Sequence, residues 1–266
     1  MTAETPPIAL GWRVYGLGAV ALAVAAFLLK DFLPGQAVPK GFPERTALAY
    51  AAAGFLLVAG AAVEWRRTAA WAAGALTVYF GVVVCGLMDV PVTVRHRAEY
   101  GAYSNLAEQL AIAAGGLIVF ARSARIEPAL AARLTRLGQA GFGVCAILFG
   151  GAHFAYMNLT APLVPKWLPL GGVFWGDATG VFHILGGVAI LIRFKDRLAA
   201  ILLTVMYAAF TPLVHLPMLI GDPANHWFWS ENATNLALTG VAWVVADSLA
   251  PVRGGVSSGR SAQPAS

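Results

Sequence analysis

Three histidines in the second half of the chain lie in apolar stretches, where an ionisable side chain is unfavourable. They are His153, His183 and His215. Other polar residues lie in the same half of the chain: Asp177 in the same stretch as His183, and Glu231 and Asn235 in the last apolar stretch. Imidazole and carboxyl groups can form hydrogen bonds, hold a proton or ligate a metal ion. Because ionisable residues inside a membrane are costly, these residues are the candidates for a ligand-binding site.

The spacing around His183 predicts which way its side chain points. Gly176, Gly180, His183 and Gly187 would share one face of an α-helix. A glycine face lets a second helix approach closely. We therefore expect His183 to point into a helix bundle and away from lipid. Asp177 lies about 100° round the helix from Gly176, at the edge of that face.

Two later segments add polar side chains. His215 ends a polar stripe in the first of them, and Pro212 just before it predicts a kink. Glu231 and Asn235 lie one helical turn apart in the last apolar segment. His153 lies near the outer end of its own segment. We expect these side chains, together with His183 and Asp177, to meet at similar depth in one bundle.

The composition is that of a membrane protein. Hydrophobic residues make up 59% of the chain and charged residues 12%, whereas a soluble domain has about 25% charged residues. An apolar stretch of about 17–25 residues is long enough to cross a bilayer as a helix. Eight such stretches are present, at 13–30, 45–63, 68–90, 104–121, 137–157, 172–192, 197–220 and 231–249. The sequence predicts an all-α polytopic membrane protein with eight transmembrane helices.

The chain repeats itself, without a gap, after a shift of 126 residues. The Val-Pro-Lys sequence at 38–40 recurs at 164–166, and Pro91 matches Pro217. Prolines and glycines constrain the backbone, so backbone geometry repeats as well as hydropathy. Each copy holds four spans, which predicts two parallel four-helix bundles. The predicted parts are a flexible tail (1–10), a first four-helix unit (11–122), a basic linker (123–136), a second four-helix unit (137–249) and a flexible tail (250–266).

The two copies differ in their polar residues. The positions that match the three histidines hold Phe27, Leu57 and Asp89 in the first copy. If the fold alone required histidine at these places, the first copy would need it too. The comparison therefore predicts that the second bundle holds the working site.

The basic residues predict the orientation in the membrane. Twelve of the 18 lysines and arginines fall on the side that carries both termini: Arg13, Arg66, Arg67, Arg122, Arg125, Arg133, Arg136, Arg193, Lys195, Arg197, Arg253 and Arg260. Cytoplasmic loops are enriched in basic residues. We expect both termini in the cytoplasm of a bacterial inner membrane. The net charge of +5 is then a topology signal and does not indicate a nucleic-acid partner.

The second unit resembles the DoxX family of four-span bacterial membrane proteins. The resemblance covers roughly 150–190: Gly-Gly-Ala-His-Phe at 150–154, Val-Pro-Lys-Trp-Leu-Pro at 164–169, Trp175, and Gly-Val-Phe-His-Ile-Leu-Gly-Gly at 180–187. The family usually has a glutamate where this chain has His183. DoxX-like proteins are associated with membrane oxidoreductase assemblies, and the related DoxD proteins with a thiosulfate:quinone oxidoreductase. The resemblance implies an accessory or quinone-interacting subunit of a membrane redox system.

The residues themselves leave the chemistry open. A quinone or another amphipathic molecule fits a site between helices, with histidine and aspartate as hydrogen-bond partners. A metal ion is less favoured because no Glu-x-x-His pair is present, and haem is less favoured because no CxxCH motif is present. The polar side chains also fit a role in which they only bridge helices.

Two other functional classes stay open beside the redox interpretation. Paired repeats suit a small-molecule carrier or permeation protein, with its site between the bundles. A non-catalytic membrane anchor for a partner enzyme also fits. If the chain takes part in catalysis, we expect it to do so as a subunit of a membrane-bound oxidoreductase, in contact with the lipid bilayer and a membrane or peripheral partner.

Overall fold

The structure, a computed structural model, describes residues 9–251. The terminal tails predicted over 1–10 and 250–266 lie almost wholly outside that range. The described chain contains helices and no strand. In the first unit these are α1 (Gly11–Leu29), α2 (Arg45–Val63), α3 (Ala69–Val78), the π-helical segment η1 (Tyr79–Asp89), α4 (Val90–Arg95) and α5 (Tyr100–Ser123). In the second unit they are α6 (Pro128–Ala155), α7 (Met157–Thr160), the short 3-10 turn η2 (Ala161–Leu163), α8 (Gly171–Ile192), α9 (Asp196–Phe210), the π-helical segment η3 (Thr211–His215), α10 (Leu216–Gly221) and α11 (His226–Ser248).

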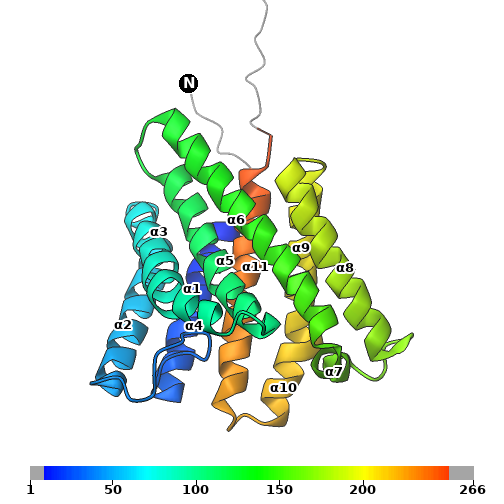
Figure 1. The fold of residues 1–266 in the computed structure, drawn as a ribbon. Helices are drawn as coiled ribbons and strands as arrows, with labels where there is room; N and C mark the ends of the chain where they lie inside the picture. The colour runs from blue at the N-terminus through cyan, green and yellow to red at the C-terminus, as the bar shows by residue number, and fades with distance from the viewer. Residues whose placement is uncertain (1–8, 252–266) are drawn as a thin grey trace, which may run out of the picture.

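The protein is an all-α, polytopic membrane protein. Seven helices among the described residues are long and apolar enough to cross a bilayer, if α3–η1–α4 and α9–η3–α10 each count as one. The eighth predicted span, α11, is long enough but is not among these seven. It lies at the centre of the molecule, where protein and not lipid surrounds it (Figure 1). A helix shielded in this way does not need a uniformly apolar surface.

Helix boundaries repeat with the same shift of 126 residues as the sequence. Helix α2 begins at Arg45 and α8 begins at Gly171, while α4 spans 90–95 and α10 spans 216–221. The π-helical segment in the third helix of each unit also ends at a matching place, Asp89 and His215, although η1 is the longer of the two. The amide of Val90 bonds to the carbonyl of Cys85, and that of Leu216 bonds to the carbonyl of Thr211. The duplication therefore extends to irregular features of the backbone.

The predicted linker is too long. Helix α5 ends at Ser123 and α6 begins at Pro128, so only residues 124–127 connect the units, and most of the stretch assigned to the linker is helical. The Glu127 side chain accepts hydrogen bonds from the amides of Ala129 and Leu130. Glu127 therefore caps the helix, and Pro128 occupies the first turn, where its missing N–H is not needed.

The two units share a broad seam. Helix α1 packs along α11, α5 packs along α6, and α5 also contacts α11. Helices α2 and α3 flank this centre on one side, and α8 and α9 flank it on the other (Figure 1). Within each unit the first helix packs on the second, the second on the third and the third on the fourth. The units are thus fused through their first and fourth helices.

Glycines allow the closest helix approaches. A Cβ atom added at Gly18 of α1 would lie 2.5 Å from the Cα of Ala237 on α11. One added at Gly150 of α6 would lie 2.5 Å from the carbonyl oxygen of Gly180 on α8. Both distances are shorter than real contacts to a Cβ, so these helices touch backbone to backbone. The same approach holds α8 in the place where His183 meets α6.

Candidate functional site

A groove of about 850 Å³ lies on the second unit, along α8 and α9. The loop between η2 and α8 borders one end through Val164, Pro165 and Leu168. Phe194 and Lys195, in the turn between α8 and α9, border the other end. Since these two segments lie at opposite ends of the helices, the groove follows most of the helix length (Figure 1). Its walls are mainly apolar, which suits a long amphipathic molecule.

Apart from Lys195 at the far end, the polar groups of the groove gather at the end near η2. His153, Thr160, Thr179 and His215 line it there. His153 lies at the end of α6 and His215 at the end of η3. A ligand with a polar head and an apolar tail would therefore meet hydrogen-bonding groups at one end and aliphatic side chains along the rest.

His183 lies behind the groove wall in the protein core. It is 2% exposed, and its ring centroid is 4.9 Å from that of His153. The ring of Tyr207 lies 5.4 Å away on another side. The structure thus places His183 inward, on the glycine face of α8, and brings it together with His153. His183 positions its neighbour and does not itself line the groove.

Both histidines have a fixed ring orientation. The Nδ1 atom of His153 lies 2.9 Å from the carbonyl oxygen of Phe149, and that of His183 lies 2.8 Å from the carbonyl oxygen of Thr179. A carbonyl oxygen only accepts hydrogen bonds, so Nδ1 must carry the proton in each ring. In the neutral form Nε2 is then an acceptor. His153 can therefore accept a hydrogen bond from a ligand hydroxyl at the groove.

The groove exists because α8 is turned relative to its counterpart α2. The buried positions of α2 are 49, 53, 56, 59, 60 and 63. A shift of 126 carries them to 175, 179, 182, 185, 186 and 189, and all six of these line the groove. The residues of α8 that are actually buried are 176, 180, 183, 186, 187 and 190, each one residue after the position obtained by shifting α2. The face that is packed in the first unit is therefore open in the second.

This rotation changes the meaning of the sequence match between Leu57 and His183. Leu57 is 38% exposed, whereas His183 is buried. The two residues match in sequence but lie on different faces of their helices. The first copy therefore does not test directly whether the core of the fold needs a histidine there.

His215 lines the same groove from η3, the π-helical segment that follows α9. Its Nδ1 atom is buried and has no hydrogen-bond partner among the described residues. The π-helical segment that ends at His215 begins beside Pro212, which cannot donate a backbone hydrogen bond. Segments of π-helix occur often at functional sites. His215 is thus a second polar group with unused hydrogen-bonding capacity.

Asn235 has a structural role beside this cluster. Its side-chain amide donates to the carbonyl of Tyr207 at 3.1 Å and to the hydroxyl of Thr211 at 2.8 Å. It therefore ties α11 to α9 at the point where α9 changes to π-helix. Asn235 is buried and is not part of the groove lining.

Two residues expected in the cluster lie elsewhere. Asp177 is exposed on the surface of α8 and does not line the groove. Glu231 does not line it either, and lies close enough to Glu108 of the first unit to interact with it electrostatically. Asp177 is outside because α8 buries its glycine face and leaves the next residue outward. Glu231 faces the seam because α11 is central and contacts both units.

A second cluster of polar residues, which is not among the predicted site residues, lies at the seam. Glu108 of α5 interacts with both Glu231 and Asp89. Asp89 is 1% exposed, and neither carboxyl oxygen makes a well-formed hydrogen bond among the described residues, although the backbone amide of Ala37 lies near it. Asp89 also matches His215 under the repeat, and both end a π-helical segment. This match was the signal that a buried ionisable group recurs at one place in both copies.

We expect the substitution Asp89→Asn to stabilise the fold. Replacing the buried carboxylate by a neutral amide removes the cost of a buried charge, which should raise the free energy of unfolding by about 1–2 kcal/mol. The measurement is denaturant or thermal unfolding in detergent at pH 8. Glu99→Gln, at an exposed position, should leave stability unchanged. A less stable Asp89→Asn protein would mean that the carboxylate makes favourable contacts.

No group of three or more histidine, cysteine, aspartate or glutamate side chains between residues 9 and 251 is arranged to hold a metal ion. Comparison with known proteins gives no further guide to the site. No protein-family model, curated protein or solved structure matches the chain. The function must therefore be inferred from the residues and the geometry of the groove.

Proposed function

We propose that the protein is a DoxX-like accessory subunit of a membrane redox system, and that the groove on its second unit binds a quinone. The observation that carries this proposal is the groove itself, with an apolar length and a polar end at His153 and His215. Both histidines are half-buried. A quinone has the same division, with oxygens on a ring at one end and an apolar chain at the other.

The head group would lie at the η2 end of the groove. A quinol hydroxyl can donate to the Nε2 atom of His153, and a protonated His153 can donate to a quinone carbonyl. His183 supports this arrangement because its ring packs on that of His153. These residues bind, orient and exchange a proton with the ligand; electron transfer would involve a partner protein.

The basic end of the molecule supports a cytoplasmic location for both termini. The turn between α2 and α3, the connection from α5 to α6 and the turn between α8 and α9 lie at the same end as both ends of the described chain (Figure 1). Arg66, Arg125 and Arg193 belong to these connections. In a bacterial inner membrane this end would face the cytoplasm. The head-group end of the groove would then face the outer leaflet.

The position of the groove favours binding over transport. It lies within the second unit, on α8 and α9, and not between the two units. The matching face of the first unit is packed. A carrier that alternates between two sides through movement of its repeats would be expected to have its site at the repeat interface.

The substitution His153→Phe tests the proposal, since phenylalanine is the first copy's own residue, Phe27. The ring size is nearly kept and the hydrogen bond is lost. We expect the wild-type protein to retain quinone after purification, and the variant to bind added ubiquinone about tenfold more weakly. Extraction followed by chromatography measures the quinone that the purified protein retains. A fluorescence titration measures the affinity for added ubiquinone.

His96→Phe is the matched control because His96 is exposed outside the groove. The proposal is wrong if wild-type protein neither retains nor binds quinone, or if His153→Phe binds it as tightly as wild type. Uptake of a small solute into proteoliposomes that is blocked by groove substitutions would instead favour a carrier.

A further inference from the structure

A second pocket, of about 320 Å³, lies at the basic end of the molecule, at the seam between the units. Four helices or their ends contribute to it: α1 through Trp12, α3 through Ala69, α5 through Val119, and α11 through Val244. It shares no residue with the quinone groove. Whatever binds here therefore concerns a separate function.

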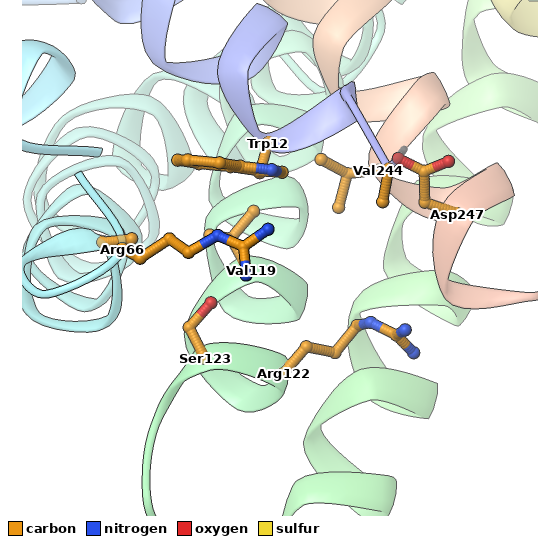
Figure 2. Close-up of a pocket in the computed structure, with 9 residues that line it drawn as sticks. Trp12, Arg66, Val119, Arg122, Ser123, Val244 and Asp247 are labelled. Atoms are coloured by element: carbon orange, nitrogen blue, oxygen red, sulfur yellow. The ribbon is translucent and has the colours of Figure 1, made fainter. Parts of the chain in front are cut away.

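Two arginines, Arg66 and Arg122, make the lining of this pocket basic. Figure 2 shows the guanidinium group of Arg66 extending into the pocket beside the indole of Trp12, with the Ser123 hydroxyl pointing towards it. Arg122 extends from the end of α5. One of its nitrogens donates to the carbonyl of Ser248 at 3.4 Å. A guanidinium group has five N–H donors, so most of the donors of Arg122 have no hydrogen-bond partner among residues 9–251.

The one acidic group in the pocket lining is already engaged. Asp247 accepts a hydrogen bond from the amide of Gly11 at 3.0 Å, which fixes the start of α1. It also interacts with Arg122 and Arg197. Glu64, in the nearby α2–α3 turn, is not part of the lining. Burial raises the pKa of its carboxyl, and the nearby Arg13 opposes that shift.

We propose that this pocket binds the phosphate group of a molecule with net negative charge, with Arg66 and Arg122 as its ligands and Ser123 as an added donor. Arginine is suited to phosphate because its planar N–H groups match two oxygens at once. A tryptophan such as Trp12 beside an apolar floor, here Val119 and Val244, is typical of the level of the lipid head groups. Basic pockets between membrane helices on the cytoplasmic side are known to take anionic head groups.

The experiment measures binding to the purified full chain in detergent by native mass spectrometry and thermal unfolding. The probes are phosphatidylglycerol, phosphatidylcholine and inorganic phosphate. We expect phosphatidylglycerol to bind and to raise the unfolding temperature. Arg66→Gln and Arg122→Gln should each weaken this binding about fivefold. Arg67→Gln is the matched control, because Arg67 is its exposed neighbour and does not line the pocket.

The probes also separate the two sources of phosphate. If inorganic phosphate alone stabilises wild type and displaces the lipid, the site takes free phosphate; if only the lipid binds, the ligand is a head group. Both results support the proposal. Equal binding by wild type and both pocket variants would overturn it. So would an equal loss in Arg67→Gln, or phosphatidylcholine binding as tightly as phosphatidylglycerol.

Discussion

The substitution Gly18→Ala is expected to destabilise the protein by about 3 kcal/mol, because it forces apart the two helices at the centre of the seam. The new Cβ would lie 2.5 Å from the Cα of Ala237, and backbone cannot move aside as a flexible side chain can. Gly18→Leu should leave no correctly folded protein. Thermal unfolding and size-exclusion chromatography in detergent measure the loss.

Gly54→Ala provides the control. Gly54 lies in the middle of α2, and a Cβ added there meets nothing within 4 Å. Alanine is a better helix former than glycine, so this variant should be as stable as wild type or slightly more stable. If Gly18→Ala were as stable as Gly54→Ala, helices α1 and α11 would lie farther apart than they do in the structure.

Filling the groove should abolish ligand binding without affecting the fold. Ala209 lines the groove, and Ala209→Trp would place an indole where the apolar part of a ligand lies. We expect quinone affinity to fall on the order of tenfold or more, because the ligand then loses its buried apolar surface. The unfolding temperature should change little, because the added ring occupies open space.

Ala208→Trp tests whether a large aromatic residue on α9 is harmful in itself. Ala208 is exposed on the neighbouring face and does not line the groove. Quinone affinity in this variant should equal that of wild type. A loss of affinity in Ala208→Trp, or normal affinity in Ala209→Trp, would place the binding site elsewhere on the protein.

Local rules predicted the helices well, because length and hydropathy determine where a membrane helix runs. They also predicted the inward direction of His183, since its glycines mark a packed face. The linker was wrong although a signal was present: Glu127 followed by Pro128 is a typical start of a helix, and the boundary was instead drawn from hydropathy.

The site was only partly predictable. His153 and His183 meet because α6 and α8 touch at Gly150 and Gly180, which sequence spacing indicates. Helical periodicity does not say which neighbour a polar side chain faces when a helix is surrounded by protein. Glu231 on α11 was therefore expected beside the histidines of the second unit, whereas it lies near Glu108 of the first unit and does not line the groove. The groove itself depends on a rotation of α8 that small packing differences along the whole helix decide.

That rotation suggests how a duplicated membrane protein acquires a new activity. Helices α2 and α8 begin at matching positions, and the π-helical segments of the two copies end at matching positions, so the order and connections of the helices did not have to change. Turning one helix by one residue exchanges a sealed surface for one open to the bilayer. A molecule dissolved in the membrane can then enter from the side, without passing through water. Divergence after duplication would in this case begin with helix packing, and new side-chain chemistry would follow.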